Sequence, residues 1–209
     1  MSSILEQLAS ASGKREQDLN IVLAQQIAAD KDKKAVKELV GGLEHKTKAI
    51  RYDCIKTLYE IAALTPGLLS SFAGTFTSLL NDKDNRMQWG AMTALSAMVS
   101  EIPEQLFGVL DQLIGVADKG SVITRDHLVR ILAGLSLHKP YTATALPLLL
   151  EQILQAPVNQ APSYAEQALP VITSEFKERL AQVLHTRLQD IEPESKRKRV
   201  EKVLKKLKA

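Results

Sequence analysis

Few side chains in this chain stand at spacings that support catalysis or metal binding. The histidines are too far apart in sequence for a zinc site, and we expect each on the surface or in a loop. They are His45, His127, His138 and His185. The segment 81–85 carries two carboxylates but lacks the full calcium-loop pattern, so it is interpreted as a capped turn. No glycine-rich phosphate loop or nucleophile-elbow serine occurs. We predict a protein that is not an enzyme, with no cofactor and no metal.

The single cysteine, Cys54, excludes an intrachain disulfide and fits a reducing compartment. The N-terminus lacks a basic start followed by an apolar block, and no run approaches the ~18 uncharged apolar residues of a membrane span. We therefore expect no signal peptide, no transmembrane segment and a cytoplasmic location. With 45% apolar and 24% charged residues, the 209-residue chain can build a continuous core, in which Cys54 serves as a small hydrophobe.

Aromatic and charged residues recur on one side of three segments, where they could bind a partner. The single tryptophan, Trp89, has Tyr52 in the matching register of the preceding segment. Tryptophan, tyrosine and arginine are favoured at binding hot spots. The candidate binding residues are Arg51, Tyr52, Lys56, Tyr59, Gln88, Trp89, Arg125, Asp126 and Arg130. The alternative is that Trp89 and Tyr52 fill space between neighbouring helices.

The C-terminal segment is basic. Residues 176–209 carry 11 Lys and Arg against 5 Asp and Glu, whereas residues 1–175 carry 16 against 19. The candidate basic residues of this tail are Lys196, Arg197, Lys198, Arg199, Lys202, Lys205 and Lys206. A narrow apolar stripe runs between them, formed by Val200, Val203, Leu204 and Leu207. The tail is therefore either a capping helix with a solvated back or a contact for nucleic acid, an anionic lipid surface or an acidic partner.

The sequence repeats at an offset of 37 residues. One column of the repeat is Cys54, Ala91, Leu128 and Ala165; a second is Leu58, Leu95, Leu132 and Leu169; a third is Ile61, Met98, Leu135 and Ile172. Within each copy the apolar residues have the spacing of one helix face. A period of this length with helical content predicts a solenoid of stacked helix pairs.

Each repeat carries signals for two helices. Proline recurs where the first helix of a pair begins, because proline at a first helical position loses no hydrogen bond. These prolines are Pro66, Pro103 and Pro140. Strong N-cap residues recur before the second helix, where a side-chain oxygen can accept hydrogen bonds from the first turn. These residues are Thr47, Asp84 and Ser121.

We predict an all-α superhelix of about six antiparallel helix pairs in one domain, residues 1–209. An N-terminal cap pair covers residues 1–32, four repeats cover 33–175, and a C-terminal cap with the basic helix covers 176–209. The opening pair is expected to have its helices at 3–11 and 15–29, and the closing pair at 176–191 and 194–208. Between them, one helix pair is expected in each of the ranges 33–63, 66–100, 103–137 and 140–175. Pro170 should kink or break the last helix of the fourth repeat.

The second helices resemble those of HEAT and armadillo repeat proteins. HEAT repeats favour an Arg-x-x-Ala-x-x-x-Leu start to this helix. The matching sets are Arg51, Cys54 and Leu58; Gln88, Ala91 and Leu95; and Arg125, Leu128 and Leu132. Each set departs from the pattern once, with Cys for Ala, Gln for Arg and Leu for Ala. The resemblance covers nearly the whole chain and implies an architecture.

The resemblance also implies that the second helices line a concave side, which places the candidate binding residues in a groove. Our leading hypothesis is a non-catalytic scaffold that binds a protein or peptide along that face. A first alternative is nucleic-acid binding, as in HEAT-like proteins that resemble DNA-alkylation repair glycosylases. A second is an accessory subunit of an enzyme, as in the HEAT-like phycobilin lyases.

Overall fold

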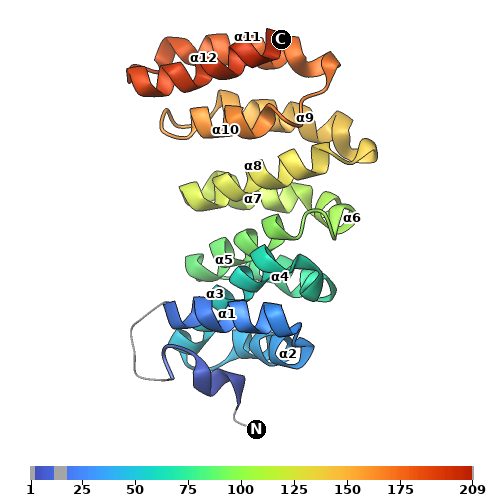
Figure 1. Cartoon of the computed structure of the whole chain (residues 1–209), viewed down its shortest axis with the longest axis vertical. Coiled ribbons are helices and arrows are strands. Elements are labelled where there is room, and N and C mark those ends of the chain that lie inside the picture. The colour runs from blue at the N-terminus through green and yellow to red at the C-terminus, as the bar shows by residue number, and fades with distance from the viewer. Residues whose placement is uncertain (1–2, 12–17, 209) are drawn as a thin grey trace. The chain divides into compact units, whose positions relative to one another are not determined.

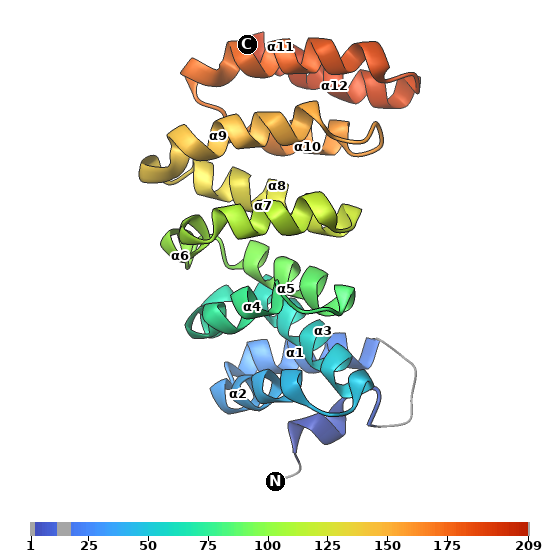
Figure 2. The ribbon, with the colours of Figure 1, turned by 180° about the vertical axis from the view of Figure 1, so that it is seen from behind.

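The computed structural model describes residues 3–11 and 18–208, and that part of the chain is helical with no strand (Figures 1 and 2). It separates into two compact units, residues 1–125 and 126–209. The boundary falls within one helix, α8 (Val122–Ser136). None of the described helices combines the length and the apolar character needed to cross a membrane.

In unit 1 the second helices form one layer. The short 3-10 helices are η1 (Ile4–Gln7), η2 (Gly42–Glu44), η3 (Pro66–Leu68) and η4 (Ser70–Phe72). The α-helices are α1 (Asp18–Asp30), α2 (Lys33–Gly41), α3 (Lys48–Leu64), α4 (Ala73–Leu79), α5 (Asn85–Ala97), α6 (Pro103–Gly108) and α7 (Leu110–Lys119). Helix α3 packs between α1 and α5, while α2 packs on α3 and α4 on α5. The α2–α3 and α4–α5 pairs therefore stack through their second helices, as the predicted solenoid of helix pairs requires.

Unit 2 continues with longer first helices. Its elements after α8 are α9 (Lys139–Leu154), α10 (Ala161–Ala168), α11 (Ser174–Asp190) and α12 (Glu194–Lys208). Helix α9 packs against α10 and α11, and α12 packs against α10 and α11. Helix α10 ends two residues before Pro170, which confirms that this proline breaks the helix. Pro147 lies inside α9 without ending it, a feature that we did not predict.

The repeat columns form the core of both units. Leu58 and Leu95 in unit 1 and Leu132 in unit 2 are fully buried. The Cys54 and Ile61 columns are also fully buried in these three copies, which confirms the helical register. The fourth copy departs from the others. Ala165 is buried there, but Leu169 and Ile172 are only half-buried because α10 has already ended.

A close backbone approach sets the spacing of α3 and α5. Gly90 of α5 faces Ile55 of α3, and a Cβ atom added at Gly90 would lie 2.5 Å from Ile55 Cγ1. A contact that short cannot exist without a shift of one helix or of the Ile55 side chain. Glycine is therefore the residue that lets these two second helices pack at their observed separation.

The prolines begin first helices as predicted, with Pro66 opening η3, Pro103 opening α6 and Pro140 in the first turn of α9. The prediction of one continuous first helix is wrong in two repeats. The segment after Pro66 is divided into η3, η4 and α4, and the segment after Pro103 is divided into α6 and α7. Gly108 and the β-branched Val109 stand at the second break, where both residue types weaken a helix.

The N-caps agree with the prediction in one repeat only. Asp84 accepts a hydrogen bond from the backbone N–H of Arg86 at 3.0 Å. Thr47 occupies the N-cap position but its side chain makes no capping bond, and the Ser121 hydroxyl is buried with no partner among the described groups. The repeat register therefore locates the cap residue, whereas the rotamer of its side chain is set by local packing.

The first cap also differs from its prediction. In place of a helix over 3–11, the structure has η1, which ends before the extended Leu8. The Glu38 side chain accepts hydrogen bonds from the Ser3 hydroxyl and, at 3.0 Å, from the backbone N–H of Ile4, so α2 holds this turn. Helix α1 agrees with the predicted second helix from residue 18 onward, and residues 15–17 of that prediction lie outside the described residues.

Candidate binding face

Aromatic side chains from neighbouring second helices meet on the surface of unit 1. Tyr52, Lys56 and Tyr59 stand four and three residues apart, so they share one face of α3. Trp89 comes from α5, which packs beside α3. The rings of Tyr59 and Trp89 are tilted by 51° with their centroids 5.9 Å apart, and both residues are half-buried. We call these four residues the aromatic face.

The aromatic face offers both apolar area and a hydrogen-bond donor. Tilted aromatic pairs at this distance pack favourably and leave ring edges and faces for a partner. Within the described part of the chain, the indole N–H of Trp89 makes no hydrogen bond, so it can donate to a partner carbonyl. The structure places Trp89 beside Tyr59 of α3, and the expectation that Trp89 and Tyr52 line a binding surface stays a prediction.

Lys56 is already engaged within α3. It pairs with Glu60 one turn later, and its ammonium group lies 4.8 Å from the centroid of the Tyr59 ring. Burial alone would lower the pKa of Lys56, but the hydrogen bonds to Glu60 and Tyr59 outweigh it and raise that pKa. Lys56 is thus a fixed cation that orients Tyr59.

Arg51 and Gln88 act inside the chain, in equivalent positions of two repeats. Arg51 Nε donates to the Leu43 carbonyl at 2.9 Å, and Gln88 Nε2 donates to the Leu80 carbonyl at 3.2 Å. Each bond ties the second helix to the carbonyl eight residues earlier. Arg51 also pairs with Asp82 at 2.7 Å. These side chains therefore hold the turns that precede the second helices.

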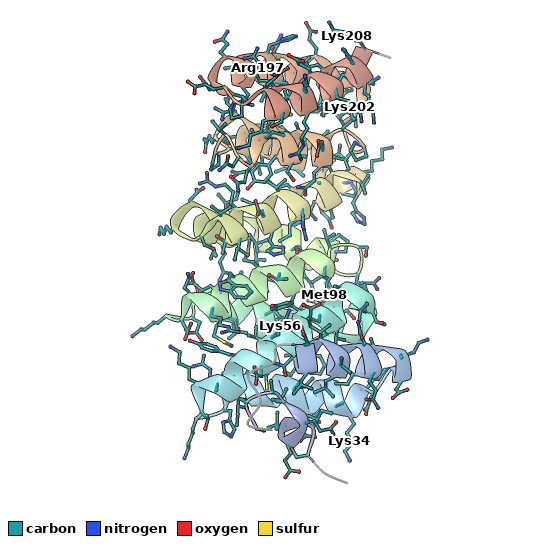
Figure 3. The ribbon with its side chains drawn as sticks, turned by 60° about the vertical axis from the view of Figure 1, so that its left-hand side comes forward. Lys34, Lys56, Met98, Arg197, Lys202 and Lys208 are labelled. Atoms are coloured by element: carbon teal, nitrogen blue, oxygen red, sulfur yellow. The ribbon has the colours of Figure 1, made fainter. Side chains whose placement is uncertain are left out.

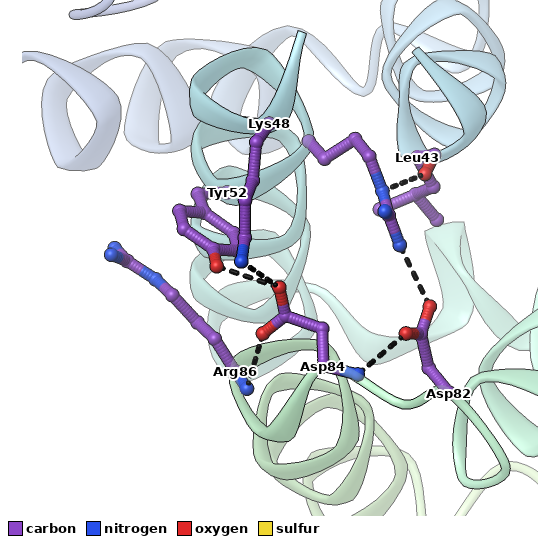
Figure 4. A network of polar contacts seen from close by, with 7 residues as sticks. Leu43, Lys48, Tyr52, Asp82, Asp84 and Arg86 are labelled. Carbon is purple, nitrogen blue, oxygen red and sulfur yellow. Dashed lines mark hydrogen bonds and ion pairs between the residues drawn. The ribbon is translucent and has the colours of Figure 1, made fainter. Parts of the chain in front are cut away.

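A polar network beside the aromatic face was missed by sequence reasoning (Figure 4). Asp84 Oδ2 accepts a hydrogen bond from the Tyr52 hydroxyl at 2.6 Å and pairs with Lys48 Nζ at 2.9 Å. The Arg86 guanidinium lies 4.5 Å from the Tyr52 ring centroid. We call Lys48, Tyr52, Asp84 and Arg86 the Asp84 clasp. It joins α3 to the start of α5. The only signal of it in the sequence was that Asp84 occupies the same repeat position as Thr47.

The clasp changes the acidity of its members. Partial burial alone would raise the pKa of Asp84, but hydrogen bonds from Tyr52, Lys48 and the Arg86 backbone lower it to about 2. The same contacts with Tyr52 and Asp84 raise the pKa of Lys48. Asp84 and Lys48 therefore pair as ions at neutral pH.

The three remaining candidates all lie on α8. In unit 1, Arg125 Nη2 lies 4.0 Å from an Asp118 carboxylate oxygen. In unit 2, Asp126 accepts a hydrogen bond from the Tyr164 hydroxyl at 2.6 Å, which links α8 to α10. Arg130 is exposed. Asp126 thus has a structural role comparable to that of Asp84, with the tyrosine supplied by the following helix.

Burial shifts the acidity of two titratable residues, Cys54 and His127. Among the described residues, no three His, Cys, Asp or Glu side chains are grouped so that they could hold a metal ion. Cys54 is fully buried as predicted, and burial raises the pKa of its thiol to about 12. The prediction of a surface or loop position is wrong for His127, which is buried in α8. Burial and then the charge of Arg130 lower its pKa to about 4.

The basic tail forms the last helix of unit 2. The apolar stripe of α12 is buried against α10 and α11, so the helix caps this unit as one of the two predicted alternatives requires. Arg197 Nη1 donates to the carbonyls of Leu188 at 2.8 Å and Ile191 at 3.3 Å, and Lys196 contacts Asn159. Lys198 pairs with Glu194 at 2.6 Å.

The remaining cations of α12 are exposed, and Figure 3 shows two of them, Lys202 and Lys208, on this helix. Lys202, Lys205 and Lys206 form no ion pair with the described residues. The capping role therefore depends on the apolar stripe and Arg197, and most of the positively charged side chains of α12 take no part in it.

Comparison with solved structures gives matches over the whole chain. An engineered protein covers 100% of this chain and 97% of its own, with a TM-score of 0.64 and 17% identity. A designed armadillo repeat protein in complex with the peptide (KR)4 covers 98% of both chains, with a TM-score of 0.66 and 18% identity. A further designed armadillo repeat protein has a TM-score of 0.60 and 17% identity over 98% of both chains.

The fold is that of an armadillo repeat protein. This all-α solenoid fold agrees with the division of the first helices after Pro66 and Pro103, since repeats of this class contain two or three helices. The identities of 17–18% establish the fold alone. No protein-family model matches the sequence, and no curated protein sequence matches it.

Proposed function

We propose that this armadillo repeat protein is a non-catalytic scaffold that binds a protein or peptide along the second-helix face of unit 1. The observation that carries the proposal is the half-buried Tyr59–Trp89 pair on adjacent second helices. Large aromatic side chains in such positions supply most of the energy at many interfaces. The candidate set is centred on the aromatic face, with Arg51 and Gln88 holding the turns behind it.

The contacts around the face favour an extended peptide as its ligand. Lys56 pairs with Glu60 and Lys48 pairs with Asp84, while Arg86 lies over the Tyr52 ring, so the rim is polar with a small excess of positive charge. The free indole N–H of Trp89 suits a backbone carbonyl. A designed armadillo repeat protein of similar fold has been solved with a bound peptide, which supports peptide binding as the class of activity. The cytoplasmic location expected from the cysteine content stays a prediction.

The test is a peptide-display selection against the full chain, followed by affinity measurement for the selected sequences. Trp89→Ala should weaken binding by at least about thirtyfold, because truncation of a hot-spot aromatic costs roughly 2 kcal/mol or more. Trp89→Phe should lose less, because the ring remains while the N–H is removed. Phe72→Ala is the matched control, since Phe72 is a half-buried aromatic in η4, among the first helices.

Circular dichroism melts of each variant separate a binding effect from a folding effect. Equal affinities for Trp89→Ala and the parent chain would refute the proposal. A Trp89→Ala chain that unfolds, combined with unchanged affinity for Trp89→Phe and Tyr59→Ala, would instead assign Trp89 to packing.

A further inference from the structure

A small hollow lies where the second helices α10 and α12 of unit 2 pack together. Its volume is about 200 Å³. Its lining consists of Glu166 and Leu169 from the α10 side and Arg199, Lys202, Val203 and Lys206 from α12. The hollow therefore combines one carboxylate, three cations and two apolar side chains.

The three cations share one side of α12. Arg199, Lys202 and Lys206 are spaced by three and four residues, which places them in a row along one helix face. Val203 is buried between them and provides an apolar floor together with the half-buried Leu169. Lys205 is exposed on the same helix but does not line the hollow.

The hollow already holds a carboxylate that belongs to the chain itself. Glu166 receives two hydrogen bonds from the Arg199 guanidinium, from Nε at 2.8 Å and from Nη2 at 2.6 Å. The hydrogen bond from Arg199, helped by the charges of Lys202 and Lys206, lowers the pKa of Glu166. This fork-to-fork geometry is the one in which arginine recognises carboxylates.

The carboxylate of Glu166 does not neutralise the positive charge of the hollow. One negative charge faces three positive ones, and Lys202 and Lys206 form no ion pair with the described residues. The side chains of Arg199 and Glu166 are 46% and 45% exposed, so water already competes with their pairing. An incoming carboxylate can therefore add to the lysines and compete with Glu166 for Arg199.

We propose that the α10–α12 hollow binds an acidic side chain of a partner peptide, with Lys202 and Lys206 as anchors and Glu166 as an internal competitor for Arg199. The site lies in unit 2 and shares no residue with the aromatic face of unit 1. It extends the scaffold function to a second contact with a defined chemical preference.

An acidic peptide fits the hollow better than a nucleic acid does. A phosphate backbone is favoured by a surface of cations alone, whereas Glu166 of α10 adds a negative charge opposite the cations of α12. The apolar floor of Leu169 and Val203 suits the methylene groups of a glutamate and an adjacent apolar residue. The limited volume suits a side chain at a single point of contact.

The test uses a fluorescein-labelled peptide, Glu-Glu-Leu-Glu-Glu-Leu, titrated with the full chain in 0.15 M salt and followed by fluorescence anisotropy. The double variant Lys202→Glu/Lys206→Glu should weaken binding by about tenfold. Lys205→Glu is the matched control, because it changes the charge of the same helix outside the hollow. It should weaken binding less than about twofold, since exposed charges are screened over ~8 Å at this salt concentration.

Glu166→Gln tests the competitor role directly. This variant keeps the shape of the side chain but frees Arg199, so it should bind the peptide about threefold to tenfold more tightly. Unchanged or weaker binding by Glu166→Gln would overturn the proposal. So would an equal loss of affinity in Lys205→Glu and in the Lys202→Glu/Lys206→Glu double variant.

Two further probes distinguish other polyanions. A single-stranded DNA 12-mer and phosphatidylserine vesicles are titrated at the same salt concentration. Tighter binding of either one, lost in the Lys202→Glu/Lys206→Glu chain, would overturn the choice of an acidic peptide. Thermal melts confirm that each variant is folded before its affinity is interpreted.

Discussion

Both units hold a carboxylate among cations where second helices meet, Asp84 in unit 1 and Glu166 in unit 2. The side chain of Asp84 is 15% exposed and accepts hydrogen bonds from Tyr52 and from the backbone of Arg86 besides its pair with Lys48. Glu166 is 45% exposed and is bound by Arg199 alone. A carboxylate among cations is therefore structural at Asp84, where burial and a backbone hydrogen bond hold it. At Glu166, where neither holds it, the carboxylate can be exchanged for that of a ligand.

The largest expected effect on stability comes from truncating a leucine of the buried repeat columns that form the core of both units. Leu95→Ala should lower the free energy of unfolding by about 2–5 kcal/mol, because Leu95 is fully buried in a regular repeat. The equivalent Leu169→Ala in the fourth copy should cost only about 1 kcal/mol, because Leu169 is half-buried. Urea denaturation measures both. Equal losses would show that the fourth copy is as tightly packed as the others.

The next effect tests the clasp. Asp84→Ala should destabilise the chain by roughly 1–3 kcal/mol, because it removes an N-cap and leaves the Tyr52 hydroxyl and Lys48 without their acceptor. Thr47→Ala is the control at the equivalent position, since Thr47 makes no capping bond. It should change stability by less than about 0.5 kcal/mol. A similar cost at both positions would mean that the clasp adds nothing to ordinary capping.

The acidity of Asp84 makes the clasp depend on pH. Its folded-state pKa is lowered from 3.8 to about 2, so its contribution is fully present above the unfolded pKa and is lost as pH falls toward the folded value. The stability difference between the parent chain and Asp84→Asn should therefore shrink between about pH 5 and pH 2. Denaturation curves across that window measure it. A difference that grows as pH falls would contradict the proposed ionised clasp.

Of the two carboxylates, the smaller effect on stability is expected at Glu166, in the exposed pair with Arg199. Glu166→Gln should alter the free energy of unfolding by less than about 1 kcal/mol, because solvent screens an ion pair that is nearly half-exposed. Thermal denaturation of this variant beside Asp84→Asn gives the comparison in one experiment. A loss at Glu166 as large as the loss at Asp84 would show that Glu166 is part of the structural frame.

Features that depend on local periodicity could be predicted from the sequence. The Leu58 and Cys54 columns, the prolines that open first helices and the apolar stripe of α12 all follow from residue spacing within one helix or one repeat. The helix break at Gly108 was visible in residue types but was outweighed by the regular apolar pattern on either side of it.

Features that depend on contacts between repeats could not be predicted in this way. The Tyr52–Asp84 and Glu166–Arg199 bonds join residues 32 and 33 positions apart, and their formation depends on side-chain rotamers and on the spacing of helices. The burial of His127 has the same origin, because a polar residue beside an apolar column can face either a neighbour or water. Helical spacing alone does not decide between these outcomes.

The close approach at Gly90 bears on what the aromatic face can recognise. Because Gly90 lies against the Ile55 side chain, the separation of α3 and α5 depends on the absence of a Cβ atom at this position, and the interval between Tyr59 and Trp89 depends on that separation. A bound peptide must match that interval with the spacing of its own residues. The substitution Gly90→Ala would increase the distance between Tyr59 and Trp89 and would favour peptides whose contacting residues are spaced differently.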